Sequence, residues 1–233
     1  MSNAEQQAWA ARQLLAGNLH GMLSTLSTEH PGYPFGSMAP YIVGHDGLPL
    51  FLLSHLSQHT RNIIEDPRCG LLLVENGEGD VQQLGRLSAP GELRPANDAT
   101  GDHERYFRYF PQTRVYFEQL GFRFFRFHPL RFHWNGGFAT ARWFGNERIV
   151  RTNPFASGEI DFIGRLQHER DDALRLMLQP RPDATLPRII GIDGEGVDVH
   201  TGASVRRLAL SSTVDSFDAL LESTATLAHG DRD

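Results

Sequence analysis

Apolar side chains recur along the first 145 residues with two different periods. Residues 5–16 carry theirs three and four positions apart, which predicts an amphipathic helix. Helices are also expected over 57–65 and 101–120. Short apolar runs between turn residues predict strands over 21–26, 37–43, 48–53, 69–75, 82–93, 122–134 and 138–144, the fifth interrupted near Pro90 and Gly91. Mostly antiparallel strands with hairpin turns favour a β-barrel over a parallel, doubly wound sheet.

The pattern changes after a polar connector at residues 146–155. Apolar positions between Phe162 and Met177 keep helical spacing, and a capping box formed by Ser212 and Asp215 is expected to open a last helix. Three short strands are predicted between these helices, over 188–192, 196–200 and 204–209. The sequence therefore predicts the α+β class, with an antiparallel barrel domain over 5–145 and a smaller α/β domain over 156–233.

Composition narrows the function classes. The formal net charge is −6, with 22 basic against 28 acidic side chains, which argues against a dedicated nucleic-acid binder. No run of about 18 apolar residues predicts a membrane span, and no secretory signal is recognisable. The single cysteine, Cys69, suits a reducing cytosol and is interpreted as a buried strand residue. A cytoplasmic protein is expected.

The most informative segment is a strand that turns sharply into a helix near residue 57. The turn carries Ser54, Ser57, His59, Thr60 and Asn62, whose hydroxyl, imidazole and amide groups can surround an anion. The N-terminus of the following helix adds unpaired N–H groups and the positive end of its dipole, so a phosphate is one interpretation. The other is that Ser57 or Thr60 simply caps the helix.

This segment resembles the flavin-phosphate segment of FMN-binding split-barrel proteins. The matching pattern is Ser54-x-x-Ser57-x-His59-Thr60-x-Asn62, and it is most similar to the haem-utilisation branch of the pyridoxamine 5′-phosphate oxidase superfamily. Residues 34–41, 136–141 and 191–198 resemble further stretches of that branch, so the resemblance covers nearly the whole chain. It implies an FMN-binding split β-barrel, a homodimer with its cofactor between two chains, and a smaller C-terminal α/β domain.

The resemblance also implies cofactor-binding residues. Four would surround the phosphate, namely Ser57, His59, Thr60 and Asn62, while Ser37 and Ser54 would approach the flavin or its ribityl chain. Trp143 would either contact the flavin or serve only in packing. Two positions depart from the family. His59 stands where a lysine is expected, which implies weaker or pH-dependent flavin binding. Arg170 stands where the C-terminal domain usually has a histidine, so a haem or metal role at that position is in doubt.

An aromatic and basic stretch at residues 122–134 has two interpretations. It forms either a flat pocket with an arginine for an anionic ligand such as haem propionates, or a barrel core with an arginine paired to a carboxylate. No zinc motif, nucleophile elbow or Ser-His-Asp order occurs, so catalytic residues stay unassigned and no metal site is expected. A haem ligand cannot be chosen among the histidines, although His229 is one candidate.

Three functions follow. The first is an FMN-dependent oxidoreductase, and the second is a haem-binding or haem-degrading protein of iron utilisation. The third is a non-enzymatic carrier of flavin or haem. In each case the expected partners are a second copy of the chain and a small molecule, with neither nucleic acid nor membrane involved. The absorption spectrum distinguishes the two cofactors.

Overall fold

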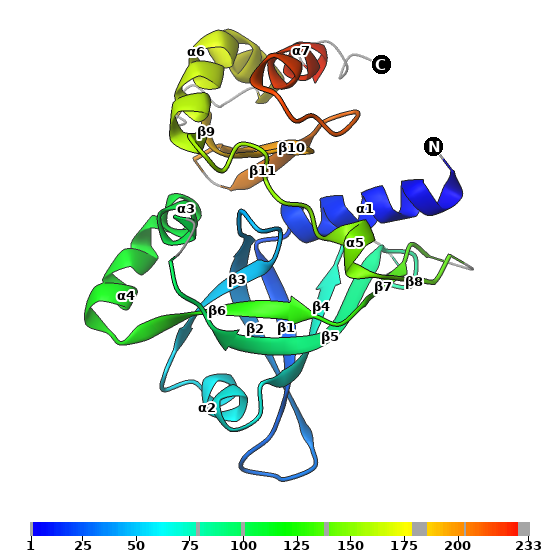
Figure 1. Cartoon of the computed structure of the whole chain (residues 1–233), viewed down its shortest axis with the longest axis vertical. Helices are drawn as coiled ribbons and strands as arrows, with labels where there is room; N and C mark the ends of the chain where they lie inside the picture. The colour runs from blue at the N-terminus through cyan, green and yellow to red at the C-terminus, as the bar shows by residue number, and fades with distance from the viewer. Residues whose placement is uncertain are drawn as a thin grey trace. The chain divides into compact units, whose positions relative to one another are not determined.

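The computed structural model describes residues 2–77, 80–98, 101–137, 140–178, 186–202 and 204–227. The chain divides into two compact units, Met1–Thr152 and Asn153–Asp233. Figure 1 shows a β-barrel with helices in the first unit and a small sheet with helices in the second. This arrangement confirms the expected α+β class.

Six antiparallel strands close the barrel. Their order is β4-β1-β2-β3-β6-β5, and pairing of β5 with β4 completes the ring. The strands are β1 (His20–Leu26), β2 (Pro34–Val43), β3 (Pro49–Ser54), β4 (Arg68–Val74), β5 (Arg86–Pro95) and β6 (Phe122–Pro129). Two short strands, β7 (Phe132–Asn135) and β8 (Arg142–Phe144), continue the sheet from β5. Alternate residues such as Leu23, Leu71 and Leu73 point inward and form the core.

Strand β5 runs through Pro90, so the expected interruption was wrong, and the strand begins four residues later than predicted. On one edge β5 pairs with β7 over Arg86–Ser88 and with β6 over Gly91–Pro95. Pro90 falls between these two pairings, where its missing N–H breaks no ladder bond. Its carbonyl still accepts a hydrogen bond from the Leu130 N–H at 2.8 Å.

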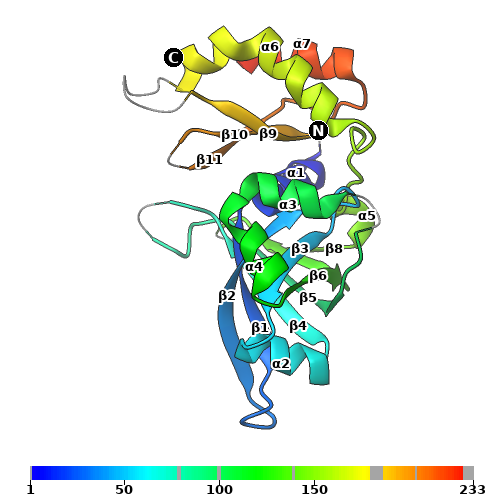
Figure 2. The same cartoon turned by 90° about the vertical axis from the view of Figure 1, so that its left-hand side faces the viewer.

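Helices flank the barrel. They are α1 (Asn3–Gly17), α2 (Gln58–Glu65), α3 (Asp102–Tyr109), the 3₁₀ turn η1 (Pro111–Thr113), α4 (Arg114–Gln119) and α5 (Asn146–Ile149). The single helix expected over 101–120 is therefore three elements, because Pro111 keeps Phe110 out of the helical conformation. The connector expected at 146–155 contains α5. In Figures 1 and 2 the β1–β2 hairpin extends beyond the barrel beside α2.

In the C-terminal unit, a three-stranded sheet packs against two helices. The strands are β9 (Arg188–Asp193), β10 (Gly196–His200) and β11 (Val205–Ala209), and the helices are α6 (Glu159–Leu178) and α7 (Phe217–Leu227). The expected capping box was wrong, since α7 begins at Phe217 and the Ser216 hydroxyl accepts a hydrogen bond from the Ala219 N–H. Arg170 joins the two helices by donating to the Leu221 carbonyl and the Thr224 hydroxyl.

Cys69 lies in the barrel wall. It is a β4 residue whose strand neighbours are Thr25 on β1 and Gly91 on β5, and only 9% of its surface is exposed. Burial raises the pKa of its thiol to about 12. These features confirm the structural interpretation of this cysteine.

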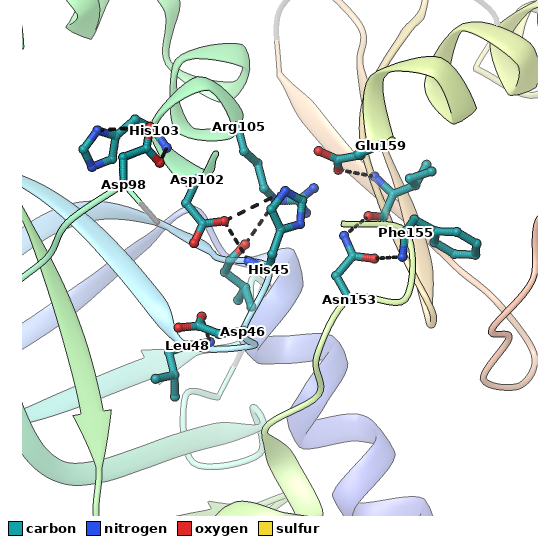
Figure 3. A network of polar contacts seen from close by, with 12 residues as sticks. His45, Asp46, Leu48, Asp98, Asp102, His103, Arg105, Asn153, Phe155 and Glu159 are labelled. Atoms are coloured by element: carbon teal, nitrogen blue, oxygen red, sulfur yellow. Dashed lines mark hydrogen bonds and ion pairs between the residues drawn. The ribbon is translucent and has the colours of Figure 1, made fainter. Parts of the chain in front are cut away.

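A buried charged cluster stands outside the barrel core. The Asp102 carboxylate accepts bonds from the His45 backbone N–H at 2.8 Å and from Arg126 at 2.7 Å, while Arg126 also pairs with Asp46 at 2.6 Å. Figure 3 shows Asp102 facing His45. Burial, reinforced by the charge of Arg105, lowers the pKa of the His45 imidazole to about 4. The ring is therefore neutral in the folded protein at neutral pH.

His45 should make stability depend on pH. Between about pH 6.5 and pH 4, the unfolded chain binds a proton at this residue that the folded chain does not. The free energy of unfolding should therefore fall as the pH drops through this window, by about 1–2 kcal/mol from His45 after allowance for solvent screening. Urea titrations at pH 7 and 4.5 measure the fall. His45→Gln should show a smaller fall, and equal falls would assign the pH dependence to other groups.

Candidate functional site

A pocket of about 150 Å³ opens beside the start of α2. Strands β2, β3 and β6 contribute to it, as does the α3–η1–α4 segment. Its polar side carries Ser54, Ser57 and His59. Its other lining residues are mostly aromatic or apolar: Met38, Ala39, Pro40, Leu52, Leu53, Tyr106, Thr113, Tyr116 and Phe122. The structure thus brings three predicted cofactor-binding residues together with aromatic rings from distant segments.

The turn before α2 presents this polar side. Strand β3 ends at Ser54, whose hydroxyl accepts a hydrogen bond from the Leu56 N–H at 3.2 Å. Ser57 is the N-cap residue in an extended conformation, yet its side chain makes no capping hydrogen bond. Its carbonyl accepts the N–H groups of Thr60 and Arg61 instead. The Ser57 hydroxyl does not have the capping role considered from the sequence.

Several buried polar atoms in the described part of the first unit lack a hydrogen-bond partner. Among the described residues, six buried side-chain atoms are in this state, and three belong to predicted site residues: Ser37 Oγ, His59 Nε2 and Thr60 Oγ1. Burying such groups unpaired costs free energy, so they indicate a bound water or ligand. Burial also lowers the pKa of the His59 imidazole, which favours its neutral form.

Asn62 differs from its neighbours, because its side chain is completely buried and already bonded. Its amide oxygen accepts from the backbone N–H and the hydroxyl of Thr28, both at 3.0 Å, and from Gln58 at 2.9 Å. Its amide nitrogen donates to the Thr25 hydroxyl at 2.9 Å. These bonds fasten the β1–β2 hairpin to α2, and Asn62 does not line the pocket.

Trp143 lies on β8 with 49% of its surface exposed and is not a lining residue of the pocket. Its ring centre lies 4.9 Å from that of His133, and the Arg131 guanidinium lies 5.5 Å from the centre of the Trp143 ring. Within one chain, the structure therefore does not bring Trp143 to the α2 turn.

A continuous row of outward-facing residues nevertheless connects these two regions. Successive cross-strand neighbours are Met38, Met22, Leu72, Ser88, His133 and Trp143, on β2, β1, β4, β5, β7 and β8. We call these six residues the outer row. The exposed fractions of Met38 and Met22 are 64% and 39%, which is high for large apolar side chains. Leu72, Ser88 and His133 are half-buried and Trp143 is exposed, so the outer row mixes apolar and polar side chains.

Successive side chains of the aromatic strand β6 point to opposite faces of the sheet, as expected for a strand. Phe125 and Phe127 enter the barrel core, whereas Arg126 is paired with the two carboxylates of the charged cluster. The carboxylate-paired interpretation of this arginine is therefore correct. Arg123 is exposed and donates to the neighbouring Phe122 carbonyl.

Some predictions fall outside the described residues, namely those at His229, Phe138 and Ala139. The described part of the chain contains no group of three His, Cys, Asp or Glu side chains that suits a metal ion. It also contains no helix with the length and hydropathy needed to cross a membrane.

Sequence reasoning missed the wall formed by Met38, Tyr106, Thr113 and Tyr116. The aromatic surplus of residues 101–120 was the available signal, but it did not say which rings face the α2 turn.

Comparison with known proteins supplies the family. The model of the CREG β-barrel matches residues 2–151, which cover the barrel and its helices. The chain belongs to this family. This family agrees with the split β-barrel that the resemblance implied.

This CREG-family chain is similar to a plant protein and a bacterial protein whose names state a reaction or a ligand. The chloroplastic heme oxygenase HOZ of Arabidopsis thaliana is 31% identical over 131 residues, which are 56% of this chain and 40% of the relative. The chain thus spans under half of that relative's length. The structure of a heme binding protein from Mycobacterium smegmatis is 26% identical, with a TM-score of 0.57 and 96% of both chains covered.

A protein of unknown function from Agrobacterium tumefaciens has a structure with a higher TM-score, 0.76, at 22% identity. The match covers 95% of this chain and 94% of that protein, so the similarity of fold extends through the C-terminal unit.

Proposed function

We propose that this CREG-family protein binds haem, with the pocket beside α2 as part of the binding site, and acts in haem breakdown or transfer. The observation that carries the proposal is that two relatives above 25% identity, one of them aligned over nearly the whole chain, are named for haem. Bound haem supplies iron and its oxygen chemistry.

The pocket residues fit such a group. Tyr116 and Phe122, whose ring centres are 5.2 Å apart, offer an aromatic wall for a planar macrocycle and exclude water. The Ser57 hydroxyl, which lines the pocket and makes no capping bond, offers a hydrogen bond to a propionate oxygen, and the buried, unbonded Thr60 hydroxyl lies three residues further along α2. A complete small-molecule site usually encloses about 300–1,000 Å³, so this pocket of about 150 Å³ holds only part of a haem.

A second chain would complete the site, and we propose a homodimer formed through the outer row. Met38 belongs to both the pocket and the outer row, so a partner covering the row also reaches the pocket mouth. The proposed dimer would bury exposed methionines and bring Trp143 into an interface, where aromatic and methionine side chains are enriched.

Met38→Glu should weaken the proposed dimer about 100-fold or more, because a carboxylate would be buried in an apolar contact. Analytical ultracentrifugation across a concentration series measures the change. Ile160→Glu is the matched control, since Ile160 is a 58% exposed apolar residue of the C-terminal unit. A monomeric wild-type protein, or a Met38→Glu variant that dimerises normally, would contradict the interface.

FMN is the second candidate cofactor, favoured by the geometry of the α2 turn. A helix N-terminus flanked by the Ser57 hydroxyl and the unbonded Thr60 hydroxyl suits a phosphate. The protein would then be an FMN-dependent oxidoreductase. If either cofactor binds without turnover, the protein would instead be a carrier.

The hydroxyls at the turn provide the functional test. Ser57→Ala combined with Thr60→Val should weaken the bound cofactor by about 1–3 kcal/mol, since each removes a hydrogen bond to an anionic group. Haem uptake is followed by its absorption band near 400 nm, and flavin uptake by bands near 370 and 450 nm. Ser211→Ala, an exposed serine of the C-terminal unit, is the control.

The same titrations separate the candidates. Tight haem binding with weak FMN binding supports the first proposal. The reverse, with riboflavin insensitive to the double substitution, supports the second. Equal losses for FMN and riboflavin would mean that these hydroxyls do not contact a phosphate.

A further inference from the structure

The pocket contains few atoms that can ligate haem iron. Histidine imidazoles, methionine thioethers and tyrosine phenolates are the usual protein ligands of this group. The lining residues supply His59, Met38, Tyr106 and Tyr116. The Tyr106 hydroxyl donates to the Pro40 carbonyl at 3.4 Å, and burial raises its pKa, so its phenolate is disfavoured. Arg170, at the position where a histidine was expected, has no lone pair to offer.

We propose that Nε2 of His59 is the protein ligand of the iron when haem occupies this pocket, an inference that rests on the proposed function. This nitrogen is buried and lacks a hydrogen-bond partner in the described structure, and its ring lines the pocket. His59 supplies the only imidazole among the lining residues. An imidazole nitrogen that makes no hydrogen bond keeps its lone pair available for a metal.

The position of His59 is set by its helix. It stands in the first turn of α2, where the Ser57 carbonyl accepts the following N–H groups of Thr60 and Arg61. Asn62, three residues further, fastens the same helix to the β1–β2 hairpin through its buried amide. The imidazole therefore projects from a braced helix rather than from a free loop, which favours a fixed ligand geometry.

The electrostatic environment agrees with this geometry. Burial favours the neutral imidazole, and only a neutral ring has a lone pair for a metal.

Absorption and electron paramagnetic resonance spectra of the full chain titrated with haem test the assignment. His59→Ala should shift the Soret band, change the ferric spin-state signal and weaken haem binding at least tenfold. Added imidazole should restore the wild-type spectrum. His59→Met should keep haem with a distinct spectrum, which separates ligand exchange from misfolding. Far-ultraviolet circular dichroism verifies that each variant is folded.

His55→Ala is the matched control. His55 lies four residues before His59, between β3 and α2. It is exposed, its Nδ1 lies 3.3 Å from the Gly121 carbonyl oxygen, and it does not line the pocket. Its substitution should leave the haem spectrum unchanged. If the haem spectrum of His59→Ala equals that of the wild type, the ligand is elsewhere and only this inference fails. If the wild-type chain takes up no haem at all, the proposed function fails with it.

Discussion

Replacing Asp102 by alanine should lower the free energy of unfolding by about 3–5 kcal/mol. Asp102 is completely buried, and one of its carboxylate oxygens accepts a hydrogen bond from the His45 backbone N–H (Figure 3). Its other carboxylate oxygen accepts a hydrogen bond from Arg126. The Arg126 side chain is itself only 10% exposed. Removal of the Asp102 carboxylate would leave Arg126 with one carboxylate partner, Asp46. It would also remove the acceptor of the buried His45 backbone N–H, and both changes cost free energy.

Urea denaturation followed by tryptophan fluorescence measures this loss. Asp66→Ala is the control, because Asp66 pairs with Arg68 in an exposed position where a salt bridge adds little stability. Asp102→Asn retains an acceptor oxygen and should fall between the wild type and alanine. A loss for Asp102→Ala as small as that for Asp66→Ala would show that the buried cluster does not depend on this carboxylate.

Asn62→Ala should cost about 2–4 kcal/mol, because it removes four hydrogen bonds and leaves buried partners unsatisfied. The β1–β2 hairpin and α2 should separate first, since those bonds join them. Hydrogen exchange at the Thr28 amide, whose N–H is bonded to Asn62, reports this local opening.

Two comparisons distinguish a structural role from a cofactor contact. Asn97→Ala, at an exposed asparagine, should leave stability unchanged. Cofactor affinity of Asn62→Ala should fall only in step with the opening of α2, because the amide braces the helix that carries His59 and does not line the pocket. A selective loss of affinity with normal stability would instead restore Asn62 to the list of cofactor ligands.

Local patterns in the sequence predicted most of the barrel. Alternating apolar residues such as Leu71 and Leu73 indicate a strand, whichever neighbouring strands it pairs with. Pro90 led to the wrong prediction of an interrupted strand. A proline fits inside β5 because it falls between the residues paired with β7 and those paired with β6, and the sequence alone does not show which strands pair with β5. The break at Pro111 follows from proline itself and was predictable from the sequence.

The site was harder to predict than the fold. Ser54, Ser57 and His59 are close in sequence, so their common location at one turn follows from local structure. Met38 and Tyr116 reach the same pocket from distant segments, and no spacing rule connects them. Asn62 shows a further limit, since an amide that suits a phosphate also suits a buried contact, and only three-dimensional packing decides between them.

The placement of Cys69 gives this protein a built-in probe of barrel opening. Thiol reagents attack the thiolate, and a pKa of about 12 together with burial makes that form scarce and inaccessible while β4 stays between β1 and β5. Modification therefore proceeds through conformations in which these strands have parted, and the alkylation rate measures how often they part. Because the chain has a single cysteine, the measurement needs no engineered label and reports from one known point in the wall.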